Sequence, residues 1–297
     1  MAEKTGQALS AGERLLAPPT AIDRRRSLTD RFWKLVSLIA GIVVIAPLVA
    51  ILFFVVARGL PTLTPQLVFN AAGNTTAPGA LNAILGSLQM VPLALLIGGS
   101  LGLAGGIYLA EFAGPRVVAI GAFVVDVLLG VPSIIAGLLV YGTVVAYVTG
   151  SSAIAGSLAL AVIIFPIVMR TTEEVLRLVP DAVREASLAL GIPTWRTTVS
   201  VVIPVARAGL LTGLMLAFAR GFGETAPLLF TARGSNALNI GQLGDPMSAL
   251  PLFVYQNSRV ASDFFVGQAW SAAIVLLAVV LLVNIVVRGR SIGSRVE

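Results

Sequence analysis

The sequence LLTGLMLAFARGFGETAPLLF, residues 210–230, constrains both the fold and the function of this chain. It is apolar and as long as the ~20 residues that cross a bilayer, yet Arg220 and Glu224 lie well inside it. An ionised side chain at the centre of a membrane helix costs about 2.5–3.5 kcal/mol on insertion scales, so such residues are functional candidates. Their i, i+4 spacing places both charges on one face of a helix. The pair predicts that something charged docks in or passes through this segment.

Two interpretations of this charged pair are open: a structural ion pair inside a helix bundle, and a site on a translocation pathway. Gly221 and Gly223 thin the helix around the charges, and Pro227 interrupts its hydrogen bonds just beyond them. Broken helices with charged residues near the bilayer midplane form substrate sites in transporters. A guanidinium also supplies a fixed cation with planar donors suited to an oxyanion. We therefore favour the pathway.

The composition is that of an integral membrane protein. Of the 297 residues, 57% are hydrophobic and 11% are charged, whereas soluble domains carry about 25% charged residues. The absence of Cys and His excludes thiolate and imidazole metal ligands, Cys nucleophiles and His general bases, so we expect no metal and no cofactor. The two lysines, Lys4 and Lys34, do not follow a glycine. The chain therefore has no P-loop, and ATP is not bound here by one.

Six apolar segments predict six transmembrane helices in an all-α membrane protein. They cover about 35–57, 83–110, 117–148, 152–170, 207–231 and 266–287. With a cytoplasmic N-terminus, sixteen of the 20 Lys and Arg residues lie inside: seven through Lys34, Arg116, five from Arg170 to Arg207, and three after residue 287. The positive-inside rule therefore predicts that both termini are cytoplasmic. This distribution explains the net charge of +6, and we expect no nucleic-acid partner.

The predicted spans divide the chain into four parts. Residues 1–33 form a cytoplasmic tail, in which Arg24 to Arg26 are expected near anionic lipid headgroups. Residues 34–82 form the first transmembrane helix and an external loop, and the long polar leader argues against a cleaved signal peptide. Residues 83–288 form the main membrane domain, with a cytoplasmic loop at 171–206. Residues 289–297 form a cytoplasmic C-terminal tail.

Sequence features inside the spans predict how the helices pack and where they break. Gly98, Gly102 and Gly106 recur at four-residue steps, a spacing that lets helix backbones approach closely in lipid; we expect ordinary packing within the chain. Residues 130–133 read Gly-Val-Pro-Ser inside the third span. A proline there requires protein or a water-lined cavity to satisfy the backbone. Asp126, one turn earlier, either faces that cavity or pairs inside the bundle.

The cytoplasmic loop 171–206 contains an amphipathic pattern. A short helix is predicted to start at Pro180-Asp181, with Asp181 as N-cap and Gly191 as the C′ residue. Arg184 and Glu185 take the side opposite a face of small residues. A nine-residue helix is not stable alone in water, so it must dock on a partner. The small-residue face consists of Ala182, Ala186, Ala189 and Leu190.

Two further polar segments are given structural interpretations. Glu173 and Glu174 sit beside Arg170 at a membrane exit, but adjacent residues on a helix point apart. We expect a solvated helix end there rather than an acid–base pair. The stretch 232–265 is too polar to span a membrane and includes Leu-Pro-Leu-Phe at 250–253. Loops of this size are usually functional, and we interpret it as a cap that faces a partner.

The cytoplasmic loop resembles the signature of ABC importer permeases: Glu-Ala-Ala, three residues, Gly, nine residues, Ile, one residue, Leu-Pro. Every spacing is kept, although Ser187, Val201 and Ile203 depart from the consensus by small steps. The resemblance implies a type I ABC importer permease fold, with residues 83–288 as its permease domain. In that family this loop is the coupling helix that inserts into a separate ATPase subunit. The coupling residues are then Arg184, Glu185, Ala186, Ser187, Gly191 and Pro204.

Within these permeases, the pattern Arg220-x-x-x-Glu224-Thr-Ala-Pro and the run 131–133 look like those of the phosphate-specific transport permeases, as does the loop from Leu250 to Tyr255. Of the two permease types in that family, A and C, chain length and loop pattern favour A. The resemblance covers about residues 80–290. It implies a heterodimer with a C-type permease, two cytoplasmic ATPase subunits, an external phosphate-binding protein, and phosphate as the substrate. The implied pathway residues are Arg220, Glu224, Arg170, Pro132 and Ser133.

The resulting hypothesis is a multi-pass permease of the bacterial inner (plasma) membrane, in contact with lipid. It is not an enzyme, because ATP would be hydrolysed by the separate subunit. Three alternatives stay open. The first is a permease for another oxyanion such as sulfate or molybdate. The second is an ion-coupled secondary transporter that uses Glu224 as a proton site, which leaves the 181–204 pattern unexplained. The third is an intramembrane enzyme, disfavoured by the lack of His and Cys.

Overall fold

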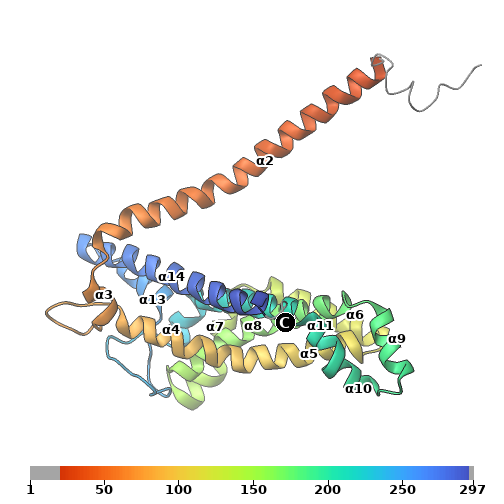
Figure 1. Ribbon diagram of the computed structural model, residues 1–297. Coiled ribbons are helices and arrows are strands. Elements are labelled where there is room, and N and C mark those ends of the chain that lie inside the picture. Colours follow the sequence, from red (N-terminus) through yellow and green to blue (C-terminus); the bar gives the residue numbers. More distant parts are fainter. Residues whose placement is uncertain (1–20, 294–297) are drawn as a thin grey trace, which may run out of the picture. The chain divides into compact units, whose positions relative to one another are not determined.

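The computed structural model describes residues 21–293, which form helices joined by loops, with one isolated β-bridge between Arg233 and Met247 (Figure 1). The chain divides into two compact units at Phe54 and Val55. The prediction that Arg24 to Arg26 lie at lipid headgroups concerns side chains of the first unit, and nothing in the structure tests it.

The first unit contains most of helix α2 (Ala21–Gly59). The large apolar side chains between Phe32 and Phe54 are exposed, and they point in all directions around the helix. A helix that is hydrophobic all round suits a lipid environment. The stretch Thr29–Thr62 is long and apolar enough to cross a membrane, which agrees with the first predicted span.

The second unit contains the remaining helices, with α9 and α10 at one end and α3 and α13 at the opposite end (Figure 1). Their bounds, in chain order, are η1 (Leu60–Thr62), α3 (Pro65–Phe69), α4 (Leu81–Ala94), η2 (Leu95–Gly99), α5 (Ser100–Glu111), α6 (Pro115–Gly130), α7 (Ser133–Val140), η3 (Tyr141–Thr149), α8 (Ala153–Arg177), α9 (Asp181–Ala189), α10 (Thr194–Thr197), η4 (Thr198–Val202), α11 (Ile203–Phe222), α12 (Ala226–Thr231), α13 (Leu250–Ser258) and α14 (Asp263–Gly293).

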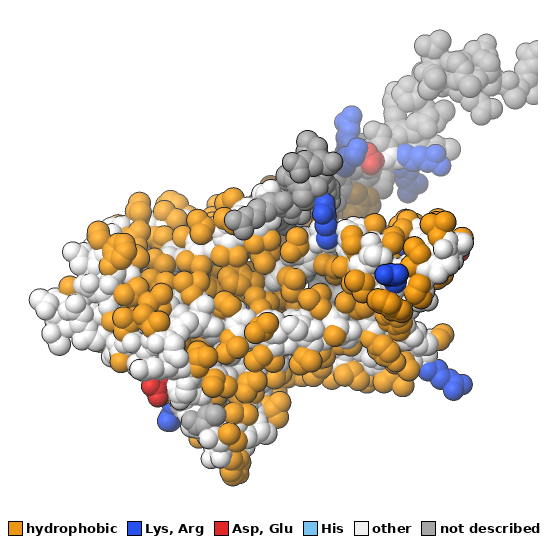
Figure 2. Space-filling view, turned by 60° about the horizontal axis from the view of Figure 1, so that its bottom comes forward, with side chains coloured by type: hydrophobic (Ala, Val, Ile, Leu, Met, Phe, Trp, Pro, Cys, Tyr) orange, Lys and Arg blue, Asp and Glu red, His pale blue; other side chains and the backbone are white. Residues whose placement is uncertain are grey.

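Among the described residues, five helical stretches are long and apolar enough to span a membrane, and a bent pair makes a sixth if it is counted as one span. They are Thr29–Thr62, Leu81–Glu111, Ala153–Arg177, Thr194–Phe222, Asp263–Val287 and the pair Pro115–Gly130 with Ser133–Val148. The bent pair corresponds to the third predicted span, and the five single stretches correspond in chain order to the other five. On the face shown in Figure 2, hydrophobic side chains cover much of the surface and charged ones are few.

The fifth predicted span, 207–231, has different limits in the structure. The helix begins at Thr194 and ends at Phe222, and α12 is a separate short helix. Pro204 does not interrupt the helix, because it lies in the first turn of α11 directly after the π-helical segment η4. A π-helical turn changes the hydrogen-bonding register, so a residue without an N–H is tolerated there.

Helix α8 lies at the centre of the second unit and packs against α4, η2, α5, α6, α7, α11 and α12. The three glycines at four-residue steps allow the closest of these approaches. A Cβ atom at any of them would lie within 2.7 Å of a backbone carbonyl oxygen of α8. The pairs are Gly98 with Ala161, Gly102 with Phe165 and Gly106 with Met169. The expectation of small-residue packing within the chain is therefore confirmed.

Two spans are broken, and the broken ends meet. The third span bends by 95° between α6 and α7, at the Val131-Pro132 step. The fifth breaks at Gly223, before α12. Gly137 of α7 faces Pro227 of α12, where an added Cβ would lie 2.5 Å from the proline Cα. The two proline-containing breaks predicted from the sequence thus form one packed junction.

The prediction of a partner-facing cap is wrong for residues 250–253 of the stretch 232–265. The side chains of Leu250, Pro251, Leu252 and Phe253 are buried in the core of the second unit. Helix α13 packs against α4 and α14, and the Leu250 N–H donates to Ser87 Oγ at 2.8 Å. Burying this apolar run inside its own chain removes it from solvent without a partner.

Candidate functional site

The Arg220–Glu224 ion pair bridges the end of α11. Arg220 is in the last turn of the helix, and Glu224 lies just beyond the terminal Gly223. Arg220 Nη2 is 2.7 Å from Glu224 Oε1, which confirms the predicted i, i+4 contact. The exposed fractions differ sharply, with 56% for the Arg220 side chain and 9% for that of Glu224. The guanidinium is therefore presented at a surface while the carboxylate is held inside.

Arg220 faces a hollow of about 340 Å³ between the α6–α7 break and α8. Among the residues lining this hollow, Arg220 is the only charged one and Ser133 contributes a hydroxyl. Most of the walls are apolar, and they include Val131, Pro166 and Ile167. Apolar walls focus the field of a single cation and raise the local concentration of anions. The arrangement can attract and hold a small oxyanion.

The structure brings three of the five predicted pathway residues together. Arg220, Glu224 and Ser133 lie at the hollow or directly behind it. Pro132 is the residue before α7 and shapes the break itself. Arg170 lies elsewhere on α8, about one turn beyond Pro166, and does not line the hollow.

Arg170 belongs to a cluster of charges at the end of α8. Its guanidinium lies 2.8 Å from Glu174, 3.7 Å from Glu173 and 3.9 Å from Asp126. Asp126 does not line the hollow at Arg220, and its side chain is 59% exposed. Its contact with Arg170 therefore lies at the surface of the chain, and neither interpretation of Asp126 is confirmed. Arg177 adds a second cation, 2.9 Å from Glu173.

The expectation of a solvated helix end is right for Glu174 and wrong for Glu173. The Glu174 side chain is 58% exposed, whereas that of Glu173 is 4% exposed. Because neighbouring helical residues point apart, one of the two carboxylates turns toward the packed side of α8. Glu173 is buried there between Arg170 and Arg177, which compensate its charge.

The short helix predicted in the loop 171–206 is present as α9, with one correction at its start. The N-cap is Pro180, which has no capping hydrogen bond from its side chain, and Asp181 is the first helical residue. The Asp181 carboxylate instead accepts from Arg184 Nη1 at 3.3 Å. Gly191 has φ +79° and follows the C-cap Leu190, as predicted for a C′ glycine.

The two sides of α9 differ from the predicted arrangement. The small-residue face is exposed, and no residue of the described range 21–293 buries it; Glu185 is exposed with it. Ser187 and, in part, Val183 and Arg184 face the chain's own helices. Arg184 and Glu185 are therefore not on one common solvent side. An exposed small-residue face is what docking on another protein requires.

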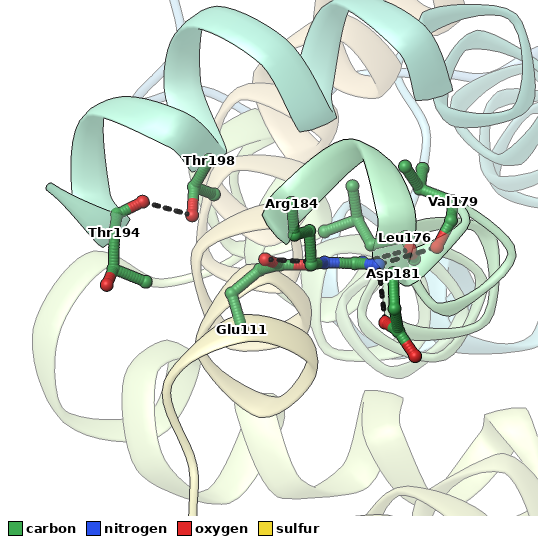
Figure 3. A network of polar contacts seen from close by, with 7 residues as sticks. All are labelled: Glu111, Leu176, Val179, Asp181, Arg184, Thr194 and Thr198. Atoms are coloured by element: carbon green, nitrogen blue, oxygen red, sulfur yellow. Dashed lines mark hydrogen bonds and ion pairs between the residues drawn. The ribbon is translucent and has the colours of Figure 1, made fainter. Parts of the chain in front are cut away.

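Arg184 binds a residue that the sequence analysis missed. Its guanidinium meets the Glu111 carboxylate at the end of α5, with Nη2–Oε1 at 2.8 Å and Nε–Oε2 at 3.3 Å (Figure 3). The Glu111 hydrogen bond raises the pKa of the Arg184 guanidinium above its ordinary value, against the opposing effect of burial. The two residues are 73 positions apart, so no local spacing could pair them. The only signal in the sequence is a carboxylate at the end of an apolar span.

Comparison with known proteins identifies the class of this helical membrane protein as the membrane component of a transport system. Residues 102–289 match the family described as "Binding-protein-dependent transport system inner membrane component", and the chain belongs to this family. A chain of the MetNI methionine ABC transporter covers 70% of this chain and 94% of its own length, with a TM-score of 0.57 at 19% identity. This likeness supports the type I ABC importer permease fold.

Several similar proteins have assigned names, and these names indicate which type of permease the chain resembles. The phosphate transport system permease protein PstA of Pasteurella multocida is 41% identical over 240 residues, 80% of this chain and 85% of the relative. PstA of Xylella fastidiosa strain 9a5c is 45% identical over 235 residues, 77% and 81% of the two chains. PstA of Mycobacterium leprae is 36% identical over 272 residues, 89% of each. The resemblance to A-type phosphate permeases is confirmed.

These comparisons establish the general class of the protein and the membrane in which it lies. The chain is a membrane subunit of a transporter, not an enzyme, and it is a component of the inner membrane. Membership of the family implies a partner permease, an ATPase and a substrate-binding protein.

Proposed function

We propose that this chain is the A-type permease of an ATP-driven phosphate importer. It would form the translocation pathway with a C-type permease, couple to two cytoplasmic ATPase subunits and receive phosphate from an external binding protein. The observation that carries the proposal is the exposed Arg220 guanidinium in a hollow with mostly apolar walls. The names of the relatives, phosphate transport system permeases, support phosphate as the anion.

The charges at the hollow suit an anion that binds and leaves. Glu224 engages one terminal nitrogen of Arg220, so the remaining N–H groups of the guanidinium can donate to phosphate oxygens, with the Ser133 hydroxyl nearby. The buried carboxylate orients the guanidinium and partly neutralises it. Such a site attracts phosphate from the binding protein but does not retain it permanently.

Arg170 would supply a second cation farther along α8. Its charge is surrounded by three carboxylates, which would repel a phosphate ion that approached closely. We therefore assign Arg170 to the passage and release of phosphate rather than to tight binding.

The exposed face of α9 would dock on the ATPase. Glu185 and the small side chains of this face, with Ala186 near its centre, are accessible, while Ser187 and Arg184 hold the helix to its own chain. Gly191 ends the helix, and Pro204 lies in the first turn of the helix that carries Arg220. ATP-driven closure would thereby switch the pathway between inward and outward access.

The test is Arg220→Gln, which removes the charge and keeps a polar side chain with N–H donors. We expect normal membrane insertion and complex assembly, while phosphate uptake by whole cells falls at least ~30-fold, because losing a charge-assisted contact costs about 2–5 kcal/mol. Arg116→Gln, at an exposed site at the start of α6, is the matched control. Wild-type uptake by Arg220→Gln would remove Arg220 from the pathway.

The same assay separates the remaining alternatives. Arsenate should compete with phosphate for uptake, and sulfate should not; the reverse result would indicate a different oxyanion. Uptake that persists without the ATPase would favour an ion-coupled secondary transporter.

A further inference from the structure

The Arg184 side chain uses its whole hydrogen-bonding capacity inside its own chain. A guanidinium has five N–H donors, and Arg184 makes five hydrogen bonds. They go to both Glu111 oxygens, the Leu176 and Val179 carbonyl oxygens, and Asp181 Oδ1 (Figure 3). The side chain is 19% exposed and that of Glu111 4%. Arg184 therefore has no donor left for an ATPase, although the signature places it in the coupling segment.

These bonds join three helices at one point. Glu111 is the last residue of α5, and Leu176 lies in the last turn of α8, with Val179 just beyond it. The last carbonyl groups of a helix have no intrahelical partner and carry partial negative charge. The guanidinium donates to the Leu176 carbonyl, which also accepts the Val179 N–H, to the Val179 carbonyl just beyond the helix, and to the buried Glu111 carboxylate. A Lys side chain could supply the charge but not this planar fork.

One of the helices that Arg184 joins, α8, also forms part of the wall of the hollow at Arg220. Backbones of the η2–α5 stretch and α8 approach closely at three glycines, so a shift of one helix end is passed to the other. Pro166 and Ile167, which line the hollow, lie about ten residues before Leu176, or ~15 Å along the helix. Helix α9 is also attached by a hydroxyl contact of 2.9 Å between Ser187 and Thr197 and by the partly buried Val183, which packs against the apolar cluster that includes Leu176.

We propose that Glu111 and Arg184 are positioning residues that fasten α9 to the ends of α5 and α8. A displacement of α9 by the ATPase then moves α8 and the Arg220 hollow instead of bending the connection at residues 178–180. This inference rests on the proposed function. The pair does not contact the substrate; it makes the mechanical link between ATP hydrolysis and the pathway.

The first test uses the importer purified with its native partner subunits and reconstituted in vesicles. The readout is phosphate transported per ATP hydrolysed. In Glu111→Gln and in Arg184→Lys we expect ATP hydrolysis to continue while this ratio falls about tenfold or more, because each change disrupts a buried charged contact. Asp30→Asn, which removes an exposed carboxylate from an ion pair with Lys34, is the matched control. A normal ratio in both variants would overturn the proposal.

A second test restores the link chemically. The chain contains no cysteine, so Glu111→Cys with Arg184→Cys creates a unique thiol pair in it. A short bis-methanethiosulfonate cross-linker should restore the ratio, and reduction of the same cross-linked complex should lower it again. The wild-type complex, treated identically, controls for thiols in the partners. A purely structural pair would not show this reversal.

The outcomes distinguish the two proposals. If the wild-type complex transports no phosphate with ATP, the proposed function fails. If it does, but cross-linking and reduction leave the ratio unchanged, only the fastening proposal fails. Failure of all the variants to assemble would assign the pair to folding and would also overturn it.

Discussion

Two arginine–glutamate pairs in this chain have the same chemistry and opposite settings. Arg220 is 56% exposed with its carboxylate behind it, whereas Arg184 is 19% exposed and makes five bonds. The first leaves donors available to an anion. The second leaves none, so it can only hold structure. Exposure, rather than residue type, distinguishes the proposed substrate site at Arg220 from the proposed positioning pair at Arg184.

The buried Glu173 gives a prediction at the residue scale. Arg177→Gln removes the close partner of this 4%-exposed carboxylate and should destabilise the protein by about 3–5 kcal/mol, because a buried charge is left poorly compensated. In a Glu173→Gln background the same change should cost less than about 1 kcal/mol, as is usual for an exposed arginine. The thermal unfolding midpoints of the four purified proteins measure this. Equal losses in both backgrounds would contradict it.

At the scale of elements, glycines and prolines determine how the spans meet. The glycines of η2 and α5 allow contact with α8, and the breaks at Pro132 and before Pro227 bring α7 and α12 together. In lipid there is little hydrophobic force between helices, so close backbone packing replaces it. The hollow at Arg220 depends on this packing, because its walls come from α6, α7 and α8.

Gly98→Ala tests this packing. The added Cβ would lie 2.4 Å from the Ala161 carbonyl oxygen, and the backbone cannot move away cheaply. We expect a loss of about 1–3 kcal/mol, as for overpacked cores, seen as a lower unfolding temperature. Gly114→Ala is the control, since a Cβ there meets nothing within 4 Å. Similar melting of the two variants would argue against close η2–α8 contact.

At the scale of the whole molecule, the second unit has two different ends. The α9–α10 end presents an exposed small-residue face, and the α3–α13 end carries the loops predicted to be external. The charge distribution predicts that the α9 end is cytoplasmic. This orientation is required if α9 docks on an ATPase and a binding protein approaches from outside.

Cysteine labelling tests the orientation, because the chain has no cysteine of its own. Thr75→Cys, in the exposed loop after α3, should react with a membrane-impermeant maleimide in cells with a permeable outer layer. Arg116→Cys, at the start of α6, should react only after the inner membrane is opened. The opposite pattern would reverse the topology and exclude ATPase docking at α9.

The sequence alone determined what depends on local patterns: six apolar spans, the breaks near Pro132 and Pro227, the end of α9 at Gly191 and the Arg220–Glu224 spacing. Only the tertiary structure decided which groups are buried. It placed Glu173 inside, put residues 250–253 in the core and joined Arg184 to Glu111 across 73 positions. Hydropathy and helical period are properties of neighbours along the chain, whereas burial and charge pairing depend on distant segments that meet only after folding.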